Sequence, residues 1–121
     1  MSKSAWKLLG NYLKDTQLLG SIESTLYWDQ NTSMPIAGSS WRGEQLTLLA
    51  KQLHARQSCK EFECLIKEAK SELQYLKEKD NLELQLIKDR SRNIELLEQD
   101  FKRQKSLDPK LVAELATAKS E

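Results

Sequence analysis

The sequence predicts an all-α protein of four to five mostly antiparallel helices, arranged as a bundle or as extended helical hairpins. Apolar residues recur at intervals of three and four along most of the 121 residues, which is the period of a helix. No stretch shows the alternation of apolar and polar residues, rich in β-branched side chains, that marks a strand. Only two prolines and four glycines interrupt the pattern. We therefore expect a single helical domain over residues 1–121.

The first two helices are expected over residues 4–31 and 40–57. The apolar face of the first consists of Leu9, Leu13, Leu19, Leu26 and Tyr27. This helix should end before Pro35, because proline disfavours the α conformation in the residue that precedes it. The second should begin with Ser39 or Ser40 as its N-cap. Its expected apolar face consists of Trp41, Gln45, Leu46, Leu48, Leu49 and Leu53.

The next two helices are expected over residues 59–77 and 81–105. Each begins at the spacing of a capping box, in which a serine or an acid stands three residues before a glutamate. The pairs are Ser58 with Glu61 and Asp80 with Glu83. The apolar stripes are Phe62, Leu65, Ile66, Ala69, Leu73 and Leu76, then Leu84, Ile87, Ile94, Leu97 and Phe101. Such stripes allow an antiparallel hairpin, which packs onto the first two helices or pairs with another copy.

A last helix is expected over residues 109–121. Asp108 is a good N-cap, and Pro109 suits the first helical position because its missing N–H needs no partner there. No glycine or proline stop signal follows. The helix is therefore expected to be truncated, with an exposed apolar face made of Leu111, Leu115 and Ala118.

The composition excludes several classes of function. Nineteen basic and eighteen acidic residues leave a net charge of +1, which argues against nucleic-acid binding by bulk positive charge. No apolar run approaches the ~20 residues that cross a bilayer, and the first residues lack the apolar stretch of a signal peptide. Two cysteines suggest a reducing compartment rather than a disulfide scaffold. We expect a cytoplasmic protein that contacts neither nucleic acid nor membrane.

Metal ligands are scarce in this sequence. A zinc hydrolase needs about three protein ligands, and the only histidine is His54. Cys59 and Cys64 lie about 140° apart on a helix, so they do not converge with that histidine on one ion. The basic segment at residues 88–92 is surrounded by acids, which is typical of a solvated helix face. No catalytic or metal-binding residue, and no cofactor, is expected within this chain.

The end of the first helix is the most unusual segment, because two large aromatic residues directly precede an acid. In one interpretation the role is local: Trp28 packs under the turn, and Asp29 or Thr32 bonds the freed backbone. In the other, the segment is a fixed corner that pairs with Arg42 or Gln45 and shapes the edge of a cleft. The residues alone leave both interpretations open.

Two stretches resemble the N-terminal part of the carboxypeptidase Taq family of zinc metallocarboxypeptidases. The first consists of Leu26, Tyr27, Trp28, Asp29, Thr32, Met34, Pro35, Gly38, Arg42, Gln45, Leu46, Leu49 and His54. The second consists of Asp100, Phe101, Lys102, Arg103, Leu107, Pro109, Leu111, Val112 and the residues 115–121. Together they cover most of the chain, but only about the first quarter of a typical family member.

The resemblance implies a helical wall or lid beside a substrate cleft. Family members remove C-terminal residues from peptides, are commonly homodimers, and hold zinc with a His-Glu-x-x-His helix and a downstream Glu. One histidine cannot form that motif, so zinc and a peptide substrate are implied only for a full-length member, and this chain alone should be catalytically silent. The implied structural corner that holds the lid helices comprises Trp28, Asp29, Thr32, Met34, Pro35, Arg42 and Gln45.

Two other classes of function remain open from the sequence. In one, the chain is a free-standing helical module that dimerises through its apolar stripes. In the other, it is a coiled-coil arm that binds a protein or RNA.

Overall fold

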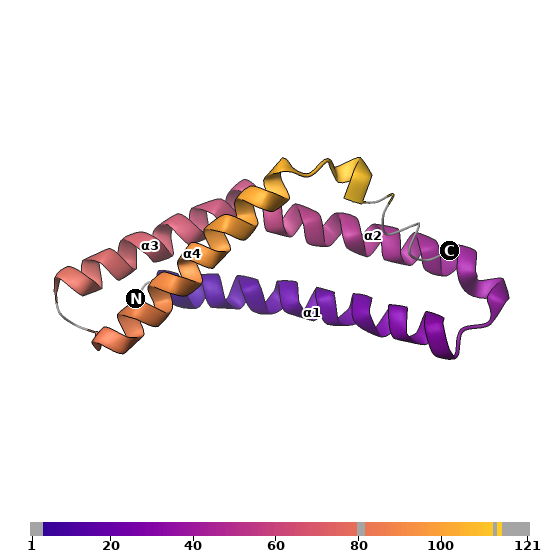
Figure 1. The fold of residues 1–121 in the computed structure, drawn as a ribbon, viewed down its shortest axis with the longest axis horizontal. Helices are drawn as coiled ribbons and strands as arrows, with labels where there is room; N and C mark the ends of the chain where they lie inside the picture. The colour runs from indigo at the N-terminus through magenta and orange to yellow at the C-terminus, as the bar shows by residue number, and fades with distance from the viewer. Residues whose placement is uncertain (1–3, 80–81, 113, 115–121) are drawn as a thin grey trace. The chain divides into compact units, whose positions relative to one another are not determined.

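Four long α-helices and one short 3₁₀-helix dominate the part of the chain that the computed structural model describes, residues 4–79, 82–112 and 114 (Figure 1). They are α1 (Ala5–Thr32), η1 (Ile36–Gly38), α2 (Ser39–Ser58), α3 (Lys60–Glu78) and α4 (Leu84–Ser106). The described residues include no strand, so the predicted all-α fold class is confirmed. No helix within the described residues is both long enough and apolar enough to span a membrane.

Two compact units make up the chain, and α1 contributes to both. The first unit comprises Met1–Leu13 and Gln57–Lys105, so it contains the start of α1 together with α3 and α4. The second comprises Lys14–Arg56 and Ser106–Glu121, so it contains the rest of α1, η1 and nearly all of α2.

The first unit has a continuous apolar core between its three helical pieces. The buried side chains are Leu9, Phe62, Ile66, Ala69, Leu73, Ile87, Ile94 and Phe101. The rings of Tyr12 and Phe62 stack with centroids 5.2 Å apart, which fixes α1 against α3. Lys70 pairs with Glu98 and Lys105 pairs with Glu63, so α3 and α4 run antiparallel. The predicted hairpin is therefore confirmed, and it packs onto the first helix.

A glutamate from α3 caps the start of α1. The backbone N–H groups of Ala5 and Trp6 donate to the two carboxylate oxygens of Glu72, over 2.6 and 3.3 Å. The first four N–H groups of a helix have no partner within the helix. A carboxylate also suits the positive end of the helix dipole. The contact therefore stabilises both the helix end and its docking onto α3.

The second unit is built on an antiparallel pair of helices. Arg42 reaches the end of α1, whereas Arg56 donates to the Thr16 hydroxyl over 2.9 Å near the middle of α1. The buried residues of α2 are Gly43, Leu46, Ala50 and His54. This differs from the predicted apolar face, because Trp41 is 68% exposed and Leu48 is 56% exposed. The buried face of α2 therefore combines the small residues Gly43 and Ala50 with Leu46, whereas Trp41 and Leu48 face outward.

Three predicted helix starts differ from the structure. Ser39 has helical angles, φ −62° and ψ −38°, because η1 runs directly into α2 and leaves no separate N-cap. Ser58 is the last residue of α2, and Cys59 occupies the N-cap position of α3. The predicted capping box at Ser58 is therefore wrong. Asp80 lies outside the described residues, and α4 begins at Leu84 rather than at residue 81.

The break between α3 and α4 is confirmed, since Lys79, Leu82 and Glu83 are not helical. Asp108 caps the following helical residues, as predicted, by accepting a hydrogen bond of 2.9 Å from the backbone N–H of Lys110. Leu111 is 52% exposed, in line with the expected apolar face. The other two residues of that face, Leu115 and Ala118, lie outside the described residues.

Candidate functional site

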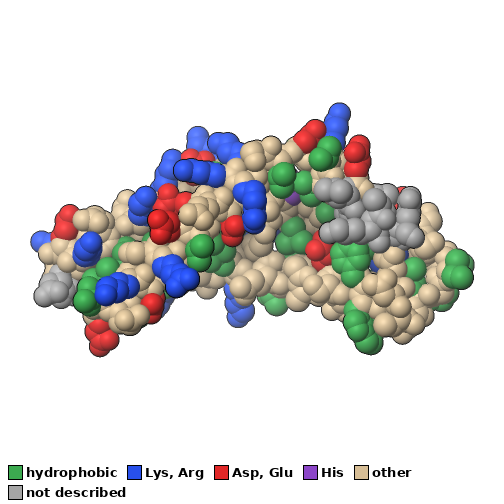
Figure 2. Space-filling model, viewed as in Figure 1, with side chains coloured by type: hydrophobic (Ala, Val, Ile, Leu, Met, Phe, Trp, Pro, Cys, Tyr) green, Lys and Arg blue, Asp and Glu red, His purple; other side chains and the backbone are tan. Residues whose placement is uncertain are grey.

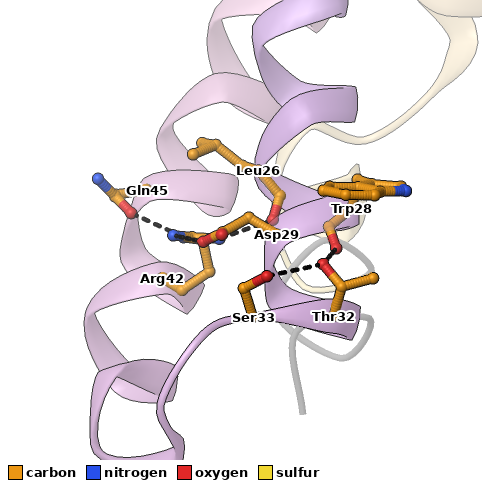
Figure 3. Close-up of polar contacts among 7 residues, drawn as sticks. All are labelled: Leu26, Trp28, Asp29, Thr32, Ser33, Arg42 and Gln45. Carbon is orange, nitrogen blue, oxygen red and sulfur yellow. Dashed lines mark hydrogen bonds and ion pairs between the residues drawn. The ribbon is translucent and has the colours of Figure 1, made fainter.

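Arg42 joins α2 to the end of α1. Its Nη2 donates to Asp29 Oδ2 over 2.8 Å, and its Nη1 donates to the Leu26 carbonyl oxygen over 2.6 Å. Its Nε donates to Gln45 Oε1, one turn along α2, over 3.0 Å (Figure 3). The Arg42 side chain is only 13% exposed. We call these four residues the Arg42 brace.

The local electrostatics of the two helices do not favour this ion pair. Asp29 lies in the last turn of α1, where the helix dipole disfavours a negative charge, and Arg42 lies in the first turn of α2, where it disfavours a positive one. Each charge compensates the other across the two helices. The planar guanidinium also offers several donors in a fixed geometry, which a lysine cannot reproduce. The brace therefore depends on the tertiary contact rather than on helix formation.

The last turn of α1 satisfies its own free carbonyl groups. The Asp29 carbonyl accepts the N–H groups of Ser33 and Met34, both at 2.9 Å. The Thr32 hydroxyl donates to the Trp28 carbonyl over 2.7 Å, and the Ser33 hydroxyl donates to the Thr32 hydroxyl over 3.5 Å (Figure 3). These bonds close the helix end, where carbonyls otherwise lack intrahelical partners.

The connection between the helices turns on Pro35. Its angles, φ −63° and ψ 145°, are extended, and its carbonyl accepts the Gly38 N–H over 2.9 Å to form η1. The Met34 side chain lies over Gly38, since a Cβ placed on that glycine would sit 3.6 Å from Met34 Cγ. That distance is an ordinary van der Waals contact. The turn is therefore compact and would accept an alanine at this glycine.

Trp28 does not pack under the turn. It is 68% exposed, and its ring points away from α2, on the far side of α1 from Arg42 (Figure 3). The local interpretation of this residue is therefore wrong. Trp41 is also 68% exposed, and Ile36 is 92% exposed. The helices α1 and α2 form a second hairpin, joined through η1, and its closed end thus carries three large apolar side chains that face outward.

The seven residues of the predicted corner fall into three groups. Asp29, Arg42 and Gln45 meet in the brace, whereas Trp28 and Thr32 are joined to each other by a hydrogen bond within α1. Met34 and Pro35 form the connection between the helices.

The Leu26 carbonyl is the acceptor that sequence reasoning missed, because a backbone oxygen has no signature in the sequence. The contact face of α2 was also missed. Its spacing of three, four and four between Gly43, Leu46, Ala50 and His54 was the available signal.

One titratable group next to the brace is perturbed. Burial raises the pKa of the Tyr27 phenol above its ordinary value of 10.0, and the nearby Glu23 carboxylate raises it further. Both effects disfavour the phenolate, because burial and a neighbouring negative charge each oppose a second negative charge. The phenol therefore stays protonated throughout the neutral range.

The donor side chains do not fit a zinc centre. Within the described ranges, no three His, Cys, Asp or Glu side chains are grouped closely enough to hold a metal ion. His54 is 6% exposed and lies in the second unit, whereas both cysteines lie in the first. Structural and catalytic zinc sites need three or four converging ligands. We therefore assign no metal ligand and derive no metal-dependent step for these residues.

Comparison with known proteins identifies one family. The model of the carboxypeptidase Taq (M32) metallopeptidases matches residues 8–121. A search of the curated proteins found no match, and neither did a search of the solved structures.

Proposed function

Because this chain belongs to the carboxypeptidase Taq (M32) metallopeptidase family, we propose that it forms the N-terminal helical wall or lid of a zinc-dependent carboxypeptidase. In this proposal the full-length enzyme removes C-terminal residues from peptides, and these 121 residues shape the cleft without taking part in the chemistry. The observation that carries the proposal is the family match over residues 8–121.

The donor set supports a role that does not involve holding the metal. The family motif needs two histidines four residues apart, and this sequence has one histidine. That histidine is 6% exposed on the buried face of α2. The ligands of the zinc, and the glutamate that acts as general base beside it, are therefore proposed to lie on residues other than these.

The geometry of the hairpin end supports a wall. The Arg42 brace fixes the two helices at their connection, and Trp28, Trp41 and Ile36 project from the fixed end. Exposed apolar side chains that gather into a contiguous patch mark a surface that contacts another part of a protein or a ligand. We propose that these three side chains pack against the rest of the enzyme or line its cleft.

The proposal extends to partners and location. A homodimer is proposed because it is common in the family, and a peptide substrate is proposed only for the full-length enzyme. Cytoplasmic location is proposed on the two cysteines, both of which are free thiols.

The test uses the 121-residue chain itself. The chain is incubated with excess zinc and passed through a desalting column, then its zinc content and its release of C-terminal amino acids from peptides are measured. We expect far less than one zinc per chain and no release above the blank. Stoichiometric zinc, or release that a chelator abolishes, would overturn the proposal.

A further inference from the structure

The first unit carries the same eight-residue pattern on both of its long helices. The pattern is Glu-x-x-apolar-Lys-x-x-Lys, and its spacing of three, four and seven places all four side chains on one face of a helix. On α3 it consists of Glu63, Ile66, Lys67 and Lys70, and on α4 of Glu98, Phe101, Lys102 and Lys105. Because α3 and α4 are antiparallel, the two copies face each other head to tail.

These eight residues line one groove, with a volume of about 330 Å³. Its apolar floor is made by Ile66 and Phe101, which belong to the core of the unit. An ion pair lies at each end: Glu63 with Lys105 at 3.9 Å, and Lys70 with Glu98 at 3.1 Å. The volume falls within the range of about 300–1,000 Å³ that is usual for small-molecule sites.

The rim of the groove has an excess of positive charge. Four lysines and two glutamates line it, so the lining carries a net charge of two positive units. Lys67 pairs with Glu63 at 2.8 Å, which leaves both glutamates engaged by lysines. Lys102, which follows the floor residue Phe101, has no ion pair within the described part of the chain. Figure 2 shows Lys and Arg side chains mixed with Asp and Glu over α3 and α4.

We propose that this groove binds a small amphipathic carboxylate. The apolar tail lies over Ile66 and Phe101, and the carboxylate binds the Lys102 ammonium, with Lys67 nearby on the opposite helix. The two ends of the pattern are seven residues apart, so the groove is about 10 Å long. This site is independent of the wall proposed above.

Two sources can supply this chemistry, a medium-chain fatty acid and the C-terminal end of an apolar peptide. Octanoate and N-acetyl-leucyl-leucine represent them in titrations of the ¹⁵N-labelled chain, followed by amide chemical shifts. Octanol supplies the tail without the charge, and acetate supplies the charge without the tail. We expect one or both of the amphipathic carboxylates to shift amides of residues 63–70 and 98–105, and the tighter of the two identifies the source.

Lys102→Gln tests the assigned contact, and Lys88→Gln is its matched control, because Lys88 is exposed on the same helix and does not line the groove. An ion pair at an exposed site changes affinity by a factor of roughly two to five. We expect Lys102→Gln to weaken binding by about three-fold and to reduce its salt dependence, and Lys88→Gln to leave both unchanged.

Several results would overturn the site. Binding of octanol as tight as that of octanoate would show that the charge is irrelevant. Shifts confined to residues outside the two patterns, or no shift with either carboxylate, would equally exclude it. If Lys102→Gln and Lys88→Gln bound the carboxylate with equal affinity, Lys102 would not be part of the site. None of these results bears on zinc content or peptidase activity, so the failure of this inference is distinct from the failure of the proposed function.

Discussion

A single guanidinium, that of Arg42, connects a side chain of α1, a backbone carbonyl of α1 and a side chain of its own helix. The three bonds measure 2.6, 2.8 and 3.0 Å and leave the group 13% exposed. Removing a donor from such a partly buried network leaves its acceptors without partners. When Arg42 is replaced, most of the loss in the free energy of unfolding should therefore come from acceptors left without a partner, rather than from loss of the ion pair itself.

Replacing Arg42 with Met should lower the free energy of unfolding by about 1–3 kcal/mol, because three acceptors lose their donor. Urea unfolding followed by circular dichroism measures this. The control is Arg92→Met, since Arg92 is exposed on α4. Arg42→Lys should recover only part of the loss, because a lysine cannot make the same directed bonds. Equal stabilities for the two methionine variants would show that the brace contributes nothing.

Glu63 makes part of the stability depend on pH. The hydrogen bond from Lys67 holds the pKa of this carboxyl below its ordinary value of 4.5, and the charges of Lys67, Lys105 and Lys60 act in the same direction. A depressed pKa stabilises the folded state above the unfolded pKa, and this stability is lost as pH falls through the folded pKa. The stabilisation should therefore be present at neutral pH and disappear below 4.5.

Glu63→Gln removes that titration. Between about pH 6 and about pH 3 the variant should lose less of its free energy of unfolding than the unmodified chain does. Denaturant unfolding at a series of pH values provides the comparison, with Glu68→Gln, an exposed site on the same helix, as the control. Parallel pH profiles for Glu63→Gln and the unmodified chain would contradict the assignment.

At the scale of helices, the period of the apolar residues predicted the helical type, and proline and capping signals predicted the approximate ends of the first four helices. The period succeeded best on α3, where the stripe from Phe62 to Leu73 is buried as expected. It failed on α2, where Trp41 and Leu48 were expected to face inward. Hydrophobicity alone favours large apolar side chains for a contact face, whereas close approach of two helices requires small ones such as Gly43 and Ala50.

Local rules also could not predict contacts made across the fold. Cys59, and not Ser58, occupies the N-cap position of α3, and η1 stands where a cap of α2 was expected. Glu72 caps a helix 67 residues away in sequence, which no local pattern encodes. At the candidate corner, the spacing of residues suggested which side chains are near each other. It could not reveal the Leu26 carbonyl or the outward position of Trp28.

The contact face of α2 can be tested by a pair of leucine substitutions. Leu46 is fully buried and Leu48 is 56% exposed. Leu46→Ala should lower the free energy of unfolding by about 2–5 kcal/mol, because it leaves a cavity, whereas Leu48→Ala should change it by less than about 0.5 kcal/mol. Thermal and urea unfolding measure both. If Leu48→Ala lowered the free energy of unfolding more than Leu46→Ala did, the contact face of α2 would be the one expected from hydrophobicity alone.

The cap on α1 gives a prediction for hydrogen exchange. Glu72→Ala should lower stability by about 1 kcal/mol and speed amide exchange at Ala5 and Trp6, whose N–H groups lose their acceptor. The matched control is Glu68→Ala, because Glu68 is an exposed residue one turn earlier on α3. Unchanged exchange at these two amides would mean that the carboxylate does not cap the helix in solution.

At the scale of the whole molecule, two observations bear on the proposed function: the family to which the chain belongs and the metal-ligating side chains that it offers. The match to a metallopeptidase family covers residues 8–121, while the described residues offer no grouped metal ligands. A folded, braced hairpin with outward aromatic side chains is suited to contact and to shaping a cleft. We propose that residues other than these carry out the chemistry of the reaction.

A chimera tests that account most directly. Residues 8–121 replace the matched segment of a zinc-containing family carboxypeptidase, and both zinc content and the rate of C-terminal residue release are measured, with and without Arg42→Met. We predict full zinc in both chimeras and release of C-terminal residues, with kcat/KM reduced by Arg42→Met. Loss of zinc on that substitution, or a zinc-loaded chimera that releases nothing, would contradict the claim that this chain is the wall of the cleft.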